Sequence, residues 1–194
     1  DAIHLKHGMN ILDIGSGSGF PMLEIADRAG ASSNVYGIDP SDDAILMINQ
    51  KIEAKEIKNA KIIKGFAEQL PFEDDYFDLI VSNNGINNVA DQEKTLAECY
   101  RVMKRGGQLV ITVNLPDTMI EFYQMFEKVL RENDMHDEIR KMKDHILEKR
   151  KPVEFIKGLF EKAGFSVRDI KLDSFKYRYI DVTAFFNHWL IRNY

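Results

Sequence analysis

The sequence is poor in cysteine and in long apolar runs. Cys99 is the one cysteine among 194 residues, so a disulfide within the chain and a cysteine-rich zinc cluster are both excluded. We therefore expect a cytoplasmic location, where thiols stay reduced. No apolar run approaches the roughly 20 residues that a membrane-spanning helix needs, and we expect no membrane span. No pattern typical of a secretory signal peptide is present.

An excess of positive charge is also lacking. The 26 Lys and Arg residues are outnumbered by 31 Asp and Glu residues, which gives a formal net charge of −5. Because nucleic-acid-binding proteins usually carry a basic face that neutralises phosphates, we expect no nucleic-acid partner. No cluster of Cys and His, and no set of carboxylates suited to magnesium, predicts a metal site. We expect a monomer or a homodimer.

Short apolar runs alternate with helical patterns through the first 114 residues. Strands are predicted at residues 9–14, 35–38, 61–64, 77–82 and 108–113. Helices are predicted within residues 21–30, after a cap at Ser41 or Asp42, and from the cap Asp91 through Met103. Strands that alternate with helices are typical of right-handed βαβ units. The pattern therefore predicts an α/β fold with a Rossmann-like, doubly wound and mostly parallel sheet.

The pattern changes after this core. We expect one domain over residues 1–194, with the core at 9–114, a helical insertion or cap at 115–151, and a helix, a strand and a helix at 152–194. The insertion is predicted to lie over the carboxyl edge of the sheet. Residues 165–172 are strand-like, and aromatic residues alternate with other residues from 175 to 180. Asp181 is expected to cap a last helix that contains Phe185, Phe186, Trp189 and Leu190.

A glycine-rich loop follows the first predicted strand, in the segment Asp13-Ile14-Gly15-Ser16-Gly17-Ser18-Gly19. Glycines allow positive φ and let the backbone approach a ligand closely, and the next helix presents free N–H groups. The loop alone is a weak signal, because a tight strand-to-helix turn without a ligand has the same composition.

Two side chains make the ligand more specific. Phe20 stands where a dinucleotide fingerprint would need its last glycine. Asp13 lies two residues before the first glycine, where a carboxylate is unfavourable beside a pyrophosphate but suits an ammonium and a sulfonium. Asp39, at the end of the second strand, could accept hydrogen bonds from both ribose hydroxyls or could simply form a turn before Pro40. A ribose contact would not separate NAD from S-adenosylmethionine.

Four motifs in order resemble the class I S-adenosylmethionine-dependent methyltransferases. They are residues 11–19 (ILDIGSGSG), 36–39 (YGID), 65–72 with 77–82 (GFAEQLPF and FDLIVS), and 98–107 (ECYRVMKRGG). The subgroup that the chain resembles most is that of the ubiquinone/menaquinone C-methyltransferases, or methyltransferase type 11. The resemblance spans residues 10–113 and implies S-adenosylmethionine as the cofactor.

The resemblance also implies a set of cofactor contacts. It places Asp13, Gly15, Ser16, Gly17 and Gly19 near the methionine part, Asp39 on the ribose, Phe66 and Ala67 beside the adenine, and Asn83 between cofactor and substrate. Pro40 and Glu68 are expected among the cofactor contacts as well. The family often has Asp where this chain has Phe66, which would either stack on the adenine or face the core.

The ends of the chain depart from the family. A strand pair normally completes the family's sheet, whereas one strand pattern precedes the last helix here, so the pair is expected to be incomplete. The chain starts at Asp1 rather than Met, and we expect truncation at both termini.

The expected reaction is methyl transfer to a small-molecule or lipophilic metabolite by in-line SN2 displacement. Orientation of the two reactants is the main requirement, since the sulfonium methyl is already activated. The sequence identifies no catalytic residue. His136, His145 and His188 are candidate general bases, although each is more typical of a surface or capping position, and His4 and His7 rank lower.

Two alternative functions are a non-catalytic cofactor-binding or partner module and an NAD-dependent oxidoreductase. Phe20 and Asp13 count against the oxidoreductase.

Overall fold

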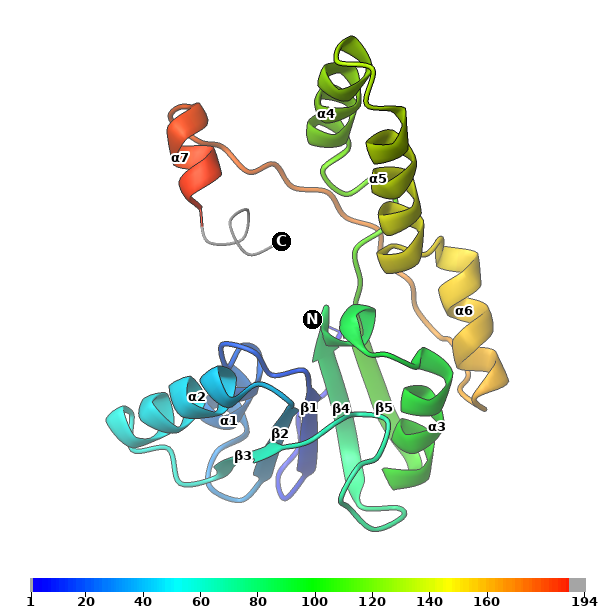
Figure 1. Ribbon diagram of the computed structural model, residues 1–194. Coiled ribbons are helices and arrows are strands. Elements are labelled where there is room, and N and C mark those ends of the chain that lie inside the picture. The colour runs from blue at the N-terminus through cyan, green and yellow to red at the C-terminus, as the bar shows by residue number, and fades with distance from the viewer. Residues whose placement is uncertain (1, 189–194) are drawn as a thin grey trace.

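A five-stranded parallel sheet forms the centre of the protein. The computed structural model describes residues 2–188 (Figure 1). The strands are β1 (Asn10–Ile14), β2 (Asn34–Asp39), β3 (Ala60–Lys64), β4 (Phe77–Asn83) and β5 (Met103–Thr112), in the spatial order β3-β2-β1-β4-β5. All neighbouring strands are parallel. The order reverses between β1 and β4, so the doubly wound topology predicted from the sequence is confirmed.

Helices cover both faces of this sheet. They are α1 (Met22–Ala29) and α2 (Asp42–Ala54) on one face, and α3 (Gln92–Val102) and α6 (Val153–Lys162) on the other. Ile11 packs toward α1 and Leu12 toward α3, because successive side chains of a strand point to opposite faces. Cys99 is fully buried in the core between the sheet and α3, and burial raises the pKa of its thiol to about 12.

Side-chain caps define where three helices begin. Ser41 accepts a hydrogen bond from the Ala44 amide at 3.3 Å, and Asp91 accepts one from the Lys94 amide at 2.9 Å. Asp181 caps α7 (Val182–Asn187) in the same way. These bonds satisfy amide groups that have no partner within a helix. The predicted caps are confirmed, with Ser41 rather than Asp42 as the cap of α2.

The junction between α3 and β5 differs from the prediction. The helix ends at Val102 rather than continuing through Met103, and β5 begins at Met103 and ends at Thr112. Its pairing with β4 is irregular between Phe77 and Leu79. Gly106 lies inside the strand with a φ of 82°, a conformation that favours glycine. The strand was predicted to begin after Gly106 and Gly107, but both glycines belong to an irregular stretch of β5.

The insertion forms a helical hairpin. It consists of α4 (Ile120–Glu132) and α5 (His136–Lys149), which pack together through a small core of Leu130, Ile139 and Met142. Figure 1 shows that this hairpin extends away from the sheet on the side where β4 ends, and that only its base lies close to the sheet. A helical insertion was predicted at the carboxyl edge of the sheet, and the structure places the hairpin beyond that edge.

The strand predicted at residues 165–172 is wrong. Residues 165–180 form no strand or helix, and several apolar side chains there are exposed, among them Phe175 and Ile180. A strand needs a neighbour for its backbone hydrogen bonds, and this segment pairs with none in the described part of the chain. Trp189 and Leu190, predicted in the last helix, lie outside the described residues.

Two further properties bear on function. Within residues 2–188, no helix is long and apolar enough to cross a membrane. In the same range, no three His, Cys, Asp or Glu side chains come together in a group that could hold a metal ion.

One acidic side chain is buried within the sheet. Asp13 shares the α1 face of β1 with Ile11 and is fully buried. Neither of its carboxylate oxygens has a hydrogen-bond partner in the described structure. Burial raises the pKa of Asp13 from 3.8 to about 7. The Ser16 side chain and the Met22 amide lie near enough to oppose this rise without cancelling it, and the charge of Asp39 adds to it.

This raised pKa predicts a pH-dependent stability. The folded protein holds the Asp13 proton up to about pH 7, whereas the unfolded chain releases it near 3.8. The folded state therefore binds more protons, and its free energy of unfolding falls as the pH rises through this window, by on the order of 4 kcal/mol. Asp13→Asn should remove this dependence, as measured by urea unfolding of the cofactor-free protein between pH 4 and pH 8. Asp27→Asn, at an exposed position of α1, is the control and should follow the wild type. Parallel curves for wild type and Asp13→Asn would contradict the prediction.

Candidate functional site

The glycine loop runs from the end of β1 to the start of α1 and is anchored on β2. The amides of Gly15 and Ser16 both donate to the Ile38 carbonyl, at 2.9 and 3.3 Å. Gly15, Gly17 and Gly19 have φ values of 70°, 50° and 95°, which lie in the left-handed region that favours glycine. The loop therefore has a defined path over the carboxyl ends of the central strands, where doubly wound sheets bind ligands.

A close contact between two backbone segments sets the position of this loop. Gly85 begins the short helix η1 (Gly85–Asn88), which follows β4. A Cβ atom on Gly85 would lie 2.2 Å from the Ile14 carbonyl oxygen, and one on Gly15 would lie 2.7 Å from the Gly85 Cα. Only glycines allow this approach. Sequence reasoning missed Gly85, although the Asn84-Gly85 pair is a turn signal.

Two hydroxyl groups connect the elements around this contact. The Ser82 Oγ donates to the Ile14 carbonyl at 2.9 Å and accepts from the Ile86 amide at 3.1 Å. The Ser16 Oγ donates to the Asp13 carbonyl at 3.1 Å. These bonds join the ends of β1 and β4 to η1 and to the glycine loop, so the edge of the sheet is fixed before any ligand binds.

Asp39 connects the loop to the end of β2. Its Oδ2 accepts from the Gly17 amide at 2.9 Å, and its Oδ1 accepts from the Ser41 amide at 2.9 Å. A carboxylate has about four acceptor positions, so each oxygen keeps capacity for a further donor. Pro40 is exposed beside it. Asp13, by contrast, is buried beneath the loop and does not reach its open surface.

The segment after β3 presents Phe66 to solvent. Its side chain is 67% exposed, whereas Ala67 is 7% exposed and packs in the core. Of the two roles left open for Phe66, facing the core is therefore excluded. Glu68 accepts from the Ala90 and Asp91 amides at 2.8 and 3.2 Å, which ties this segment to the start of α3.

Asparagines form part of the lining of a cavity next to η1. The cavity has a volume of about 300 Å³, and Asn84, Asn87, Asn88 and Asn114 form one part of its lining. Asn83, just before them, accepts a hydrogen bond from the Thr112 hydroxyl at 2.5 Å and so faces β5. The resemblance singled out Asn83, and the structure places the loop that follows it against this cavity.

Basic residues near the end of α5 complete the lining, namely His145, Lys149 and Arg150. Of the histidines considered as bases, His145 alone lines this cavity. His136 is exposed at the start of α5, and His188 lies against the rings of Tyr177 and Tyr179. Sequence reasoning missed Lys149 and Arg150, because the polar face of this helix has the composition of a solvated surface.

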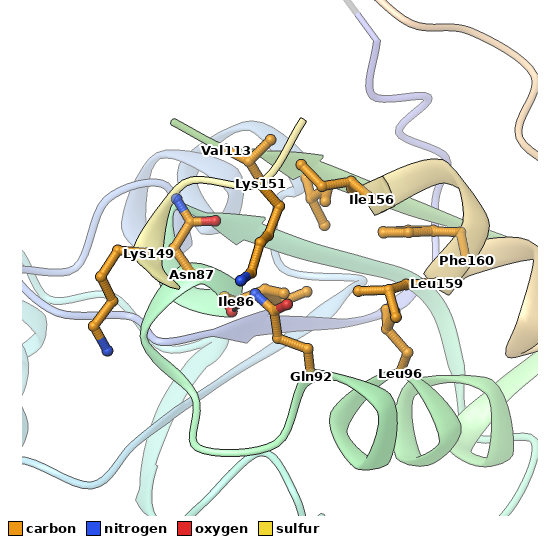
Figure 2. A pocket seen from close by; sticks show the side chains of 11 residues that line it. Ile86, Asn87, Gln92, Leu96, Val113, Lys149, Lys151, Ile156, Leu159 and Phe160 are labelled. Atoms are coloured by element: carbon orange, nitrogen blue, oxygen red, sulfur yellow. Dashed lines mark hydrogen bonds between the residues drawn. The ribbon is translucent and has the colours of Figure 1, made fainter. Parts of the chain in front are cut away.

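A second gap lies between α6 and the sheet (Figure 2). Its volume is about 10 Å³, which is room for about one water molecule. Figure 2 shows the Lys151 side chain extending toward Ile86 and Gln92, while Leu159 and Phe160 of α6 lie to one side. We interpret this gap as a small packing defect between α6 and the sheet, which is too small to hold a substrate.

Comparisons with known proteins agree with this geometry. A sequence family described as a methyltransferase domain matches residues 5–174. Curated relatives include a demethylmenaquinone methyltransferase from Bacillus mycoides, 36% identical over 120 residues, which cover 62% of this chain and 51% of the relative. Another, from Geobacillus, is 33% identical over 124 residues, which cover 64% of this chain and 53% of the relative. The chain thus spans about half the length of these relatives.

Solved structures show the same fold. A SAM-dependent methyltransferase from Aquifex aeolicus is 29% identical, with a TM-score of 0.53 over 56% of this chain and 57% of that one. The YcgJ protein from Bacillus subtilis is 21% identical, with a TM-score of 0.65 over 86% of this chain and 66% of that one, and supports the fold alone. With the family match over most of its length and the glycine loop at the switch point, the chain belongs to the class I S-adenosylmethionine-dependent methyltransferases, with S-adenosylmethionine as the methyl donor.

Proposed function

We propose that this protein transfers the methyl group of S-adenosylmethionine to a small-molecule acceptor, with the cofactor on the glycine loop and the acceptor over η1. The observation that carries the proposal is the anchored loop, held by Ile38 and Asp39 at the carboxyl ends of β1 and β2. We further propose that the chain acts as a single domain, as a monomer or homodimer in the cytoplasm.

Asp39 is the proposed ribose ligand. The Gly17 and Ser41 amides already orient its carboxylate, and the remaining acceptor positions suit the two hydroxyl groups of a ribose. Because these amides hold the carboxylate in place, little ordering is needed when the cofactor binds. The exposed Pro40 would border the same sugar.

Asp13 is proposed to act from beneath the loop. A sulfonium and an ammonium bound above Gly15 and Gly17 would favour the charged form of this buried carboxyl. Its negative charge would in turn favour a cationic cofactor in a medium of low dielectric constant. A carboxylate without hydrogen-bond partners costs stability, and this cost is acceptable where function requires the charge.

Phe66, Ala67 and Glu68 are proposed to form the adenine side of the site. The exposed Phe66 ring offers a face for stacking, while the bonds of Glu68 to the start of α3 hold the segment in place. Asn83 would border both ligands from the end of β4.

The chemical step requires alignment more than acid–base chemistry. An electron pair of the acceptor attacks the methyl carbon, the carbon–sulfur bond breaks, and its electrons stay on sulfur to give S-adenosylhomocysteine. Holding both reactants in line can contribute about 7–11 kcal/mol. Where the acceptor must lose a proton, His145 is the proposed base, since it lines the cavity over η1.

Binding tests the cofactor site first. In calorimetry, S-adenosylmethionine should bind at micromolar strength and NADH should not. Asp39→Ala should weaken binding of S-adenosylmethionine by about 100-fold, since two hydrogen bonds to a charged acceptor are lost. Asp42→Ala is the control, because the Asp42 side chain is exposed and pairs with Lys64. Unchanged affinity in Asp39→Ala, with circular dichroism like the wild type, would remove Asp39 from the site.

Turnover then tests the reaction itself. With methyl-labelled S-adenosylmethionine and a protein-free metabolite extract, label should enter a small molecule and S-adenosylhomocysteine should form in equal amount. The Asp39→Ala variant should lower the rate at limiting cofactor. Cofactor binding without label transfer would instead favour the non-catalytic module.

Phe66→Ala tests the stacking role. Loss of an aromatic platform under a base costs about 1–3 kcal/mol, so affinity for S-adenosylmethionine should fall by about 5- to 150-fold, while Phe66→Tyr should keep it. The melting temperature should not change, since the side chain is exposed. Phe175→Ala, at a 78% exposed position outside the site, is the matched control. A lower melting temperature with normal affinity would mean that Phe66 serves packing.

A further inference from the structure

The cavity over η1 contains a buried cation without a counter-charge. Arg150 is 3% exposed, and its Nη1 has no hydrogen-bond partner within residues 2–188. Its Nη2 donates to the Tyr123 hydroxyl at 3.0 Å, and the guanidinium carbon lies 4.9 Å from the centre of the same ring. No carboxylate in the described part of the chain forms an ion pair with Arg150. An uncompensated buried charge is strongly unfavourable, so an anion bound here would be favoured.

The rest of the cavity lining also favours an anion. Lys149 and His145 are the other ionisable residues of the lining, and four asparagine amides supply hydrogen-bond donors. Among the residues that the structure describes, no Asp or Glu lines the cavity, although the chain as a whole is acidic. Within residues 2–188, Glu148 alone forms an ion pair with one of these cations: its Oε1 lies 3.4 Å from the Lys149 Nζ, and its side chain is 70% exposed. An anion would therefore meet attraction without a competing acid inside the cavity.

The position of the cavity indicates that the favoured anion belongs to the methyl acceptor. Asn84 and Asn87 flank or belong to η1, whose Gly85 is in contact with Gly15 of the glycine loop. A group in the cavity is thus separated from the loop by one short turn of backbone. The volume of about 300 Å³ is at the lower end of the range for small-molecule pockets.

We propose that the protein selects acceptors that carry an anionic group, a carboxylate or a phosphate, held by Arg150 in the cavity between η1 and the end of α5. This proposal rests on the proposed function, because it assigns the substrate class of that same site. The Arg150 guanidinium would hold the anion, with Tyr123 fixing the position of one of its nitrogens. The acceptor's reacting atom would then point past Gly85 toward the glycine loop.

A matched pair of probes tests this preference. Benzoate and benzamide have nearly the same shape and differ in charge. Protein saturated with S-adenosylhomocysteine is titrated with each by calorimetry. Benzoate should bind at least about tenfold more tightly than benzamide, since hydrogen bonds to charged groups are stronger. Phenyl phosphate, as a third probe, distinguishes a carboxylate site from a phosphate site.

The outcomes separate this proposal from the proposed function. If benzoate binds no better than benzamide, or neither binds while S-adenosylhomocysteine does, the anion proposal fails and the proposed function stands. If S-adenosylhomocysteine itself does not bind, the proposed function fails.

Two variants locate the binding group. Arg150→Met should lower benzoate affinity at least about tenfold, with S-adenosylhomocysteine affinity within about twofold of wild type. Arg140→Met is the control, as Arg140 lies on the exposed face of α5 and pairs with Asp137. Should Arg150→Met not fold, Asn88→Asp places a carboxylate in the lining at an exposed position and should weaken benzoate while leaving benzamide unchanged. Loss of S-adenosylhomocysteine affinity in folded Arg150→Met would assign Arg150 to the cofactor's carboxylate and overturn the acceptor assignment.

Discussion

The contact between Gly15 and Gly85 is the constraint on which the rest of the site depends. At the switch point of the sheet, β1 continues toward α1 on one face and β4 continues toward η1 and α3 on the other. Their backbones meet so closely that neither residue has room for a side chain. The glycine loop is therefore in direct backbone contact with η1, whose Asn87 and Asn88 line the cavity. This proximity is what an in-line transfer between two bound molecules requires.

Acidic side chains lie at the glycine loop, and basic side chains line the cavity. Asp13 and Asp39 lie under and beside the glycine loop, whereas Lys149 and Arg150 line the cavity beyond η1. A cationic donor and an anionic acceptor would each meet a complementary surface, and the arrangement would disfavour their exchange. Both Asp13 and Arg150 have buried atoms without hydrogen-bond partners. In each case the missing partner corresponds to a charge that the proposed ligand would supply.

The helical hairpin contributes chiefly through its base. Its own core is small, with Leu130, Ile139 and Met142 packed beside Tyr123, and the rest of the hairpin extends away from the sheet. Because Arg150 follows α5 directly and contacts Tyr123 of α4, it joins the two helices where they approach the site. Binding of an anion at Arg150 would thus stabilise the hairpin as well as the complex.

The sequence by itself determined the parallel sheet, the glycine loop and Asp39, because strand periodicity, capping residues and positive-φ glycines are local properties of the chain. It did not determine the irregular start of β5, the unpaired segment 165–180 or the environment of Phe66, since these depend on which neighbours a segment finds in space. Arg150 is the clearest case. In the sequence it is one of several charges on and after a polar helix, and only the tertiary structure places it, buried and without an ion-pair partner among residues 2–188, at the cavity next to η1.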